Sequence, residues 1–374
     1  MTKSLDTKLA RILSDPSCGD FILADAKDAD MAFGVAAPGR HPDGRARTLE
    51  EFHDIIVDNV EQGLLDIMLM SPSTNEQLTM RRRIFDRSHI TPAARANDTT
   101  DIHLAAGSVY ASRASRPFRS AAIEHLMYGT LHPKPGAPVA GADLGLYSVT
   151  FNNDLERDLE SLEAYRAFRL EAESKGFRHF LEVFNPNACG QNCLAPEGLG
   201  RYINDMIVRT LAGVVSAARP LFLKIAYNGP EAMEQLASYD RSLVVGILGG
   251  ASGTTFDAFH QLAEARRYGA RVALYGRMIN NSEHQRTMIQ HLRWIADGEL
   301  DDPAQAVRSY HGELQNLGIP PLRPLEDDLK LTDRGLAYSA GRNRASVNPG
   351  RARPSGKGDD KIAQNLERWD RILG

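Results

Sequence analysis

The sequence of 374 residues lacks the features that mark several classes of protein. Its three cysteines, Cys18, Cys189 and Cys193, are too few for a disulfide framework to hold a chain of this length. No apolar run approaches the roughly 18 residues that a membrane-spanning helix needs, and the first residues lack the apolar core of a signal peptide. We therefore expect a cytoplasmic globular protein without a membrane partner.

The chain also lacks a charge excess and an evident set of metal ligands. A formal net charge of -4 gives no electrostatic basis for binding nucleic acid. Cys189 and Cys193 form only half of a metal site, so the favoured alternatives are small loop residues or a redox-sensitive pair. No histidines converge where strands are expected to end, since His89 and His179 begin theirs. We expect no bound metal.

One apolar stretch of strand length carries a single charge in its middle. Residues 220–227 read PLFLKIAY, and the charged residue, Lys224, lies between Leu223 and Ile225. Lysine is almost never fully buried without a partner or a purpose. A buried amine is driven toward its neutral form, which attacks a ketone to give a Schiff base. The alternative is an edge strand or a lysine that lifts its ammonium into solvent.

Strand-like and helix-like segments alternate along most of the chain. Several of the strands are uniformly apolar, which is typical of a parallel sheet covered by helices. No GxGxxG motif follows the first strand, so the dinucleotide-binding alternative loses its main signal. The number of strands predicts an α/β fold of the (β/α)8 TIM-barrel type. The eight expected strands are residues 21–25, 65–70, 89–94, 144–150, 179–184, 220–227, 243–248 and 271–275.

Three segments fall outside this alternation. Residues 31–47 are rich in Gly, Pro and Arg and are expected to form a long loop or lid, and residues 103–142 an enlarged crossover. We expect a barrel domain at 1–300 and a C-terminal extension at 301–374, partly irregular with a short terminal helix. The extension is expected to be a solvated arm that crosses a barrel face or reaches a neighbouring subunit of a homo-oligomer.

A second charge lies within an apolar strand next to that of Lys224. Glu182 occupies the middle of the fifth strand, and active sites of such barrels lie at the carboxyl ends of the strands. A carboxylate beside a barrel lysine can hydrogen-bond the amine and move protons during an aldol reaction. The alternative is a structural buried ion pair, which also perturbs protonation. Two opposite charges at matching depth favour chemistry.

The loops after the last two strands have the composition of a phosphate site. Gly249, Gly250 and Ser252 follow the seventh strand, and Gly276 and Arg277 follow the eighth. Glycines allow an anion to approach the backbone, and an arginine offers a fork of donors. These loops are the usual phosphate-binding place in a TIM barrel. The alternative is a tight glycine turn with a capping pair, Thr254 and Asp257.

Two further charges end the first strand. Asp25 and Lys27 are expected either to form a second charged pair around the substrate, in which the amine tunes Lys224, or to be ordinary loop charges.

With these residues identified, the chain resembles the class I aldolases of the tagatose-bisphosphate and deoxyribose-phosphate aldolase superfamily, and the tagatose-bisphosphate aldolase branch most closely. The resemblance covers residues 15–300 and rests on FLEV at 180–183, LFLK at 221–224, GGAS at 249–252 and LYGR at 274–277.

The resemblance implies a role for each matching residue. Lys224 would form the Schiff base and Glu182 would be the acid and base. Gly250, Ser252 and Arg277 would contact a substrate phosphate, and Asp25 falls where the family has an aspartate on the first strand.

The resulting prediction is a Schiff-base aldolase, a carbon-carbon lyase of carbohydrate metabolism. It would act on a phosphorylated ketose-like sugar or ketone and need no metal or organic cofactor. The alternatives are a Schiff-base isomerase, transaldolase or decarboxylase on the same lysine, and a non-catalytic aldolase-like regulator.

Overall fold

Eight parallel strands close into a barrel in the computed structural model, which describes residues 2–15, 17–41, 43–249, 253–333 and 336. Neighbouring strands around the barrel follow the order β1, β10, β9, β8, β7, β6, β3, β2. This arrangement confirms the predicted (β/α)8 TIM barrel. The strands are β1 (Ile22–Lys27), β2 (Ile67–Met70), β3 (Thr91–Arg95), β6 (Leu144–Thr150), β7 (Arg178–Phe184), β8 (Leu223–Ile225), β9 (Val245–Leu248) and β10 (Val272–Tyr275).

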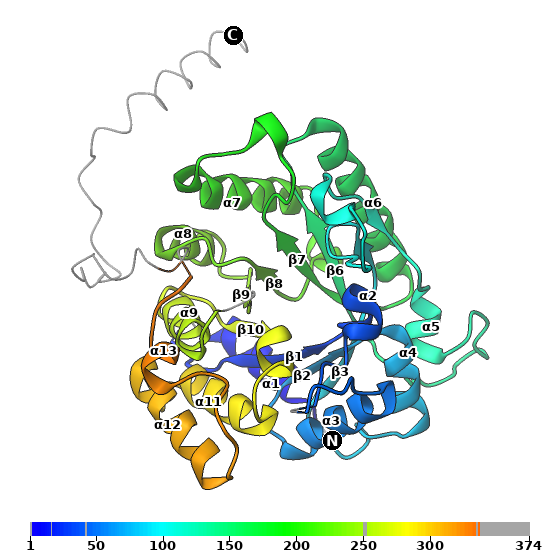
Figure 1. The fold of residues 1–374 in the computed structure, drawn as a ribbon. Helices are drawn as coiled ribbons and strands as arrows, with labels where there is room; N and C mark the ends of the chain where they lie inside the picture. The colour runs from blue at the N-terminus through cyan, green and yellow to red at the C-terminus, as the bar shows by residue number, and fades with distance from the viewer. Residues whose placement is uncertain (1, 16, 42, 250–252, 334–335, 337–374) are drawn as a thin grey trace, which may run out of the picture. The chain divides into compact units, whose positions relative to one another are not determined.

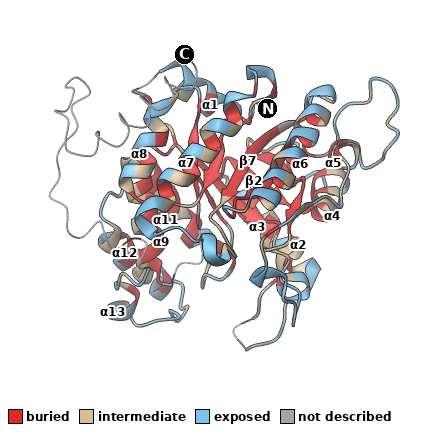
Figure 2. Ribbon diagram, turned by 90° about the horizontal axis from the view of Figure 1, so that it is seen from above, coloured by how far each residue is buried: buried red, intermediate tan, exposed pale blue. Residues whose placement is uncertain are grey.

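Helices surround the barrel, with their buried faces toward the strands and their exposed faces in solvent (Figure 1 and Figure 2). Local signals set their ends. The helix α3 begins with a capping box between Thr48 and Glu51, and α9 begins with the predicted pair Thr254 and Asp257. The longer helices are α1 (Ser4–Ser14), α3 (Leu49–Gln62), α6 (Leu155–Ser174), α7 (Pro196–Ala212), α8 (Pro230–Tyr239), α9 (Thr255–Arg267), α11 (Gln285–Asp297) and α12 (Pro303–Asn316).

Side chains along each strand point alternately into the barrel and toward the helices, as the period of a strand requires. One buried cluster fills the barrel interior and includes Ile22, Ala24 and Phe180. Leu5 and Leu9 of α1 belong to the same cluster, so this helix closes the end where the strands begin. The carboxyl ends of the strands therefore form the end that remains for a site.

The two irregular segments contain short helices and strands of their own. The crossover between β3 and β6 holds a small hairpin of β4 (Asp98–Thr99) and β5 (Pro117–Phe118) and the helix α5 (Ile123–Tyr128). The segment expected to be a lid contains α2 (Asp30–Phe33) and a 3-10 turn, η1 (Gly34–Ala36).

The predicted domain boundary at residue 300 falls between α11 and α12. The helix α12 buries Val307, Tyr310 and Leu314 in the same outer core as α9 and α11. The division into a barrel domain and an extension remains a prediction, and the predicted terminal helix lies outside the described residues. Among the residues that the structure describes, no helix is long and apolar enough to span a membrane.

Candidate active site

Lys224 and Glu182 meet inside the barrel at the carboxyl ends of adjacent strands. The two residues are register partners across β8 and β7, and both follow inward-pointing phenylalanines two positions earlier. Nζ of Lys224 lies 2.5 Å from Oε1 of Glu182, and their side chains are 8% and 2% exposed. The two charges therefore meet at matching depth, as the sequence indicated.

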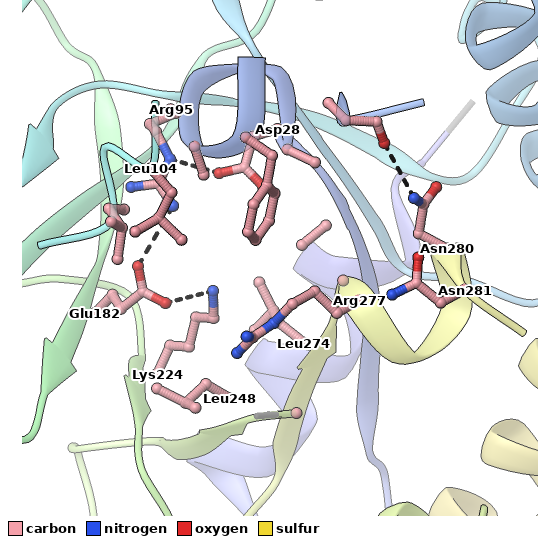
Figure 3. Close-up of a pocket in the computed structure, with 18 of the residues that line it drawn as sticks. Asp28, Arg95, Leu104, Glu182, Lys224, Leu248, Leu274, Arg277, Asn280 and Asn281 are labelled. Atoms are coloured by element: carbon pink, nitrogen blue, oxygen red, sulfur yellow. Dashed lines mark hydrogen bonds and ion pairs between the residues drawn. The ribbon is translucent and has the colours of Figure 1, made fainter. Parts of the chain in front are cut away.

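The second oxygen of Glu182 is held by two residues from other strands. Oγ of Ser148, on β6, donates to Oε2 at 2.6 Å, and the guanidinium of Arg95, on β3, lies 3.6 Å from the same oxygen. Arg95 also donates to the carboxylate of Asp28 at 2.5 Å (Figure 3) and to Ser148 at 3.1 Å. Hydrogen bonds and ion pairs thus connect these buried side chains continuously from Asp28 to Lys224.

The charges in this chain stabilise one another. Burial opposes the charge on Arg95, but the carboxylates of Asp28 and Glu182 outweigh burial and raise the pKa of the guanidinium above its usual value. Asp98 is buried nearby, and burial raises its pKa to about 6 although Arg95 acts in the opposite direction. Arg95 is therefore a fixed positive charge that keeps Glu182 in place opposite Lys224.

Sequence reasoning missed Arg95, Asp28 and Ser148. The expected third strand ends at residue 94, one position before Arg95, and the expected first strand ends at residue 25, before Asp28. The alternation of β1 contained the signal that would have identified Asp28, because Ile22, Ala24 and Ala26 point inward and Asp28 continues that series.

Asp25 and Lys27 lie on the other face of β1. Asn59 of α3 donates to Oδ2 of Asp25 at 2.9 Å, and Lys27 donates to Gln285 of α11 at 2.8 Å. The two charges are 3.3 Å apart, and both side chains are 0% exposed. Burial raises the pKa of Asp25 and lowers that of Lys27. The structure brings this pair together between strand and helices, and neither residue lines the cavity.

A cavity of about 340 Å³ opens above Lys224. Of the residues predicted to bind phosphate, Gly249, Gly276 and Arg277 line it, whereas Gly250 and Ser252 lie outside the described residues. Arg277 begins the short helix α10 (Arg277–Asn280) and extends into the cavity from the side opposite Glu182 (Figure 3). Within the described parts of the chain, no carboxylate lies within ion-pair distance of its guanidinium.

One of the two lining glycines has a clear packing requirement. A Cβ atom on Gly249 would lie 2.2 Å from the ring of Tyr275, so no larger residue fits there without a shift. The close approach of these two strand ends explains this glycine independently of any ligand. The case for an anion at this end of the cavity therefore depends on Arg277.

The loop after β7 contains a disulfide between Cys189 and Cys193. The two cysteines are therefore close enough to pair, and their redox sensitivity remains a prediction. Elsewhere in the described chain, no cluster of three or more His, Cys, Asp or Glu side chains is arranged to hold a metal ion.

Comparison with known proteins places the fold among aldolase barrels. An archaeal fructose 1,6-bisphosphate aldolase superimposes with a TM-score of 0.53 at 14% identity, over 79% of this chain and 100% of its own. A Schiff-base-forming fructose-1,6-bisphosphate aldolase gives 0.54 at 14% identity, over 78% and 100%. A protein of Corynebacterium glutamicum gives 0.50 at 14% identity, over 79% and 94%.

At these identities the likeness concerns the fold alone, and membership of the superfamily suggested by the sequence motifs remains a prediction. The nearness to tagatose-bisphosphate aldolase remains a prediction. No model of a protein family and no curated protein sequence matches the chain.

Proposed function

We propose that the protein is a class I aldolase that forms or cleaves a carbon-carbon bond in a phosphorylated ketose-like substrate through a Schiff base on Lys224. The observation that supports this most strongly is the 2.5 Å contact between Nζ of Lys224 and Glu182 at the wall of a cavity. An amine with an adjacent carboxylate has both the nucleophile and the proton carrier that imine formation needs.

The contacts of Glu182 assign it the proton transfers. Oε1 takes a proton from the Lys224 ammonium, the free amine attacks the ketone carbon, and the returned proton lets the carbinolamine oxygen leave as water. Ser148 and Arg95 hold Oε2, so Oε1 stays directed at the amine. The acid-base group therefore needs no rearrangement between the two transfers.

The protonated imine then acts as an electron sink. In cleavage, the electrons of the carbon-carbon bond move toward the imine nitrogen, the substrate hydroxyl loses its proton to Glu182, and an aldehyde leaves. The remaining enamine takes up a proton at carbon, and water hydrolyses the imine to release the ketone. Arg277, on the opposite side of the cavity, would bind the phosphate of the ketone fragment.

The test is reduction of the protein with borohydride in the presence of dihydroxyacetone phosphate. The expected result is one covalent addition per chain in the wild type and none in Lys224→Arg, which keeps the charge but is not a Schiff-base nucleophile. Absence of an adduct with this ketone and with a panel of keto acids and aldehydes would refute the proposal. Product analysis then separates an aldolase from an isomerase or decarboxylase, whose trapped adduct is the same.

A further inference from the structure

The cavity above Lys224 has two chemically different parts. The charged groups lie on strands, on α10 and at Asp28 directly after β1, whereas the cover over the carboxyl end of the barrel is apolar. This cover, called the roof below, consists of lining residues from the segment after β1 and from the crossover after β3: Ala29, Ala32, Phe33, Ala36, Ala37, Ile102 and Leu104.

The roof is attached to the barrel at several points. Asp30 accepts a hydrogen bond from Ser71 at 2.6 Å, after β2. The backbone of Leu104 donates to that of Ala32 at 2.7 Å, which joins the two segments of the roof. The side chain of Asn280, on α10, donates to the carbonyl of Ala37 at 3.1 Å. These bonds fix the apolar surface over the cavity, so its composition bears on what the cavity accepts.

The cationic side chains of the cavity differ in whether a carboxylate already neutralises them. Among the described residues that line it, the cationic side chains are Arg95, Lys224 and Arg277. Arg95 is engaged by Asp28 and Glu182, and Lys224 by Glu182. Among the described lining residues this leaves Arg277 to neutralise an anionic group, and its side chain reaches from α10 toward Lys224 (Figure 3). The roof itself offers a phosphate no charged side chain among these residues.

We infer that the substrate has a single anionic end, bound at Arg277, and an aldehyde-derived half that is unphosphorylated and apolar, enclosed by Phe33 and Leu104. This inference rests on the proposed function and specifies its substrate class. A phosphate under the roof would lie against apolar side chains without gaining a counter-charge from them, which is unfavourable. An apolar group there would gain from burial.

The corresponding synthetic step balances without a further reactant. The enamine carbon of the ketone bound at Lys224 supplies the electron pair for the new bond to the aldehyde carbon. The aldehyde oxygen takes a proton from Glu182, and hydrolysis of the imine by water regenerates the amine. The roof contacts only the aldehyde in this step, so it determines which aldehydes are accepted.

The choice of aldehyde is measured by competition with the full-length protein. Dihydroxyacetone phosphate is the donor, and isobutyraldehyde and glyceraldehyde 3-phosphate compete as acceptors. We expect at least about a tenfold higher kcat/KM for isobutyraldehyde. If donor trapping on Lys224 succeeds but the phosphorylated acceptor reacts equally well or better, the inference is wrong and the aldolase proposal stands. If trapping fails with this ketone and with the panel of keto acids and aldehydes, the proposed function itself is wrong.

A matched pair of roof variants tests the same point independently of the wild-type ratio. Phe33→Arg places a cation on the lining surface, and Val35→Arg places one two residues further on, at a side chain that lies outside the lining and is 98% exposed. We expect the first variant to shift the acceptor preference toward glyceraldehyde 3-phosphate by about tenfold or more and the second to leave it unchanged. An equal shift in both variants, or none in Phe33→Arg with donor trapping intact, would contradict the inference.

Discussion

Two buried lysine-carboxylate pairs occupy different faces of the same barrel. Lys224 and Glu182 point inward and adjoin the cavity, whereas Lys27 and Asp25 point outward and are sealed under α3 and α11. The Lys224 side chain is 8% exposed and that of Lys27 is 0% exposed. Both pairs satisfy buried charges, but only the first can be reached by a substrate. Access therefore distinguishes the two pairs, and a catalytic role of Asp25 and Lys27 remains an untested prediction.

The largest expected effect follows from removing the inner amine. We expect Lys224→Met to lower turnover by at least about 10³-fold, because the covalent intermediate is lost while the apolar stem is kept. Circular dichroism and the urea midpoint should show a folded protein. A variant that is folded and retains more than a tenth of wild-type turnover would exclude Lys224 as the Schiff-base residue.

We expect disruption of the outer pair, Lys27 and Asp25, to lower the free energy of unfolding. Lys27→Met leaves Asp25 buried without its cation, and breaking such a pair costs about 3 to 5 kcal/mol. Urea unfolding measures this loss, and the double variant Lys27→Met with Asp25→Asn should recover part of it. Borohydride trapping at Lys224 should persist in the folded fraction. Loss of trapping in a protein that is still folded would show that the outer pair takes part in the chemistry.

Arg95, which contacts Glu182, is expected to have an intermediate effect on kcat. We expect Arg95→Met to lower kcat by about 10- to 100-fold, because Oε2 of Glu182 loses a positive charge that holds it in position. Donor trapping should continue, since Lys224 is intact. Arg95→Lys, which keeps the charge, should recover part of kcat. Equal turnover in Met and Lys variants would mean that Arg95 acts only through packing.

The two pairs also show how far sequence reasoning reaches. The positions of Lys224 and Glu182 were predictable because each is the single charge within an apolar strand, and strands adjacent in the chain are neighbours in a barrel. Asp25 and Lys27 lie at the expected end of their strand, but one residue of register decides which face a side chain takes. Counting inward positions from Ile22 assigns both residues to the helix side.

The remaining parts of the site depend on tertiary contacts that no local pattern encodes. Arg95 ends a short strand of small residues, so only its contacts with Asp28 and Glu182 reveal its place in the site. The roof forms because Leu104 binds to Ala32 and Asn280 to Ala37, across more than 70 residues of chain. Composition identified residues 31–47 as a loop or lid and gave no indication of the apolar surface that it presents to the cavity.

The smallest expected effect concerns Asp98, whose pKa of about 6 lies above the usual value near 4. The folded protein binds this proton more tightly than the unfolded chain, so the contribution of Asp98 to the free energy of unfolding falls as pH rises from about 4 to 6 and is constant above. Asp98→Asn should remove this contribution to the pH dependence of the free energy of unfolding and raise stability at pH 7.5 by about 1 kcal/mol. Urea unfolding at pH 4.5 and 7.5 checks this, and an equal difference at both pH values would contradict it.

The most direct test of the central claim compares the two lysines in one sample. The protein is reduced with borohydride in the presence of dihydroxyacetone phosphate, digested, and its peptides are read by mass spectrometry. The account predicts an adduct on the peptide that contains Lys224 and none on the peptide that contains Lys27, because only the first amine adjoins the cavity. An adduct on Lys27 with Lys224 unmodified would contradict it.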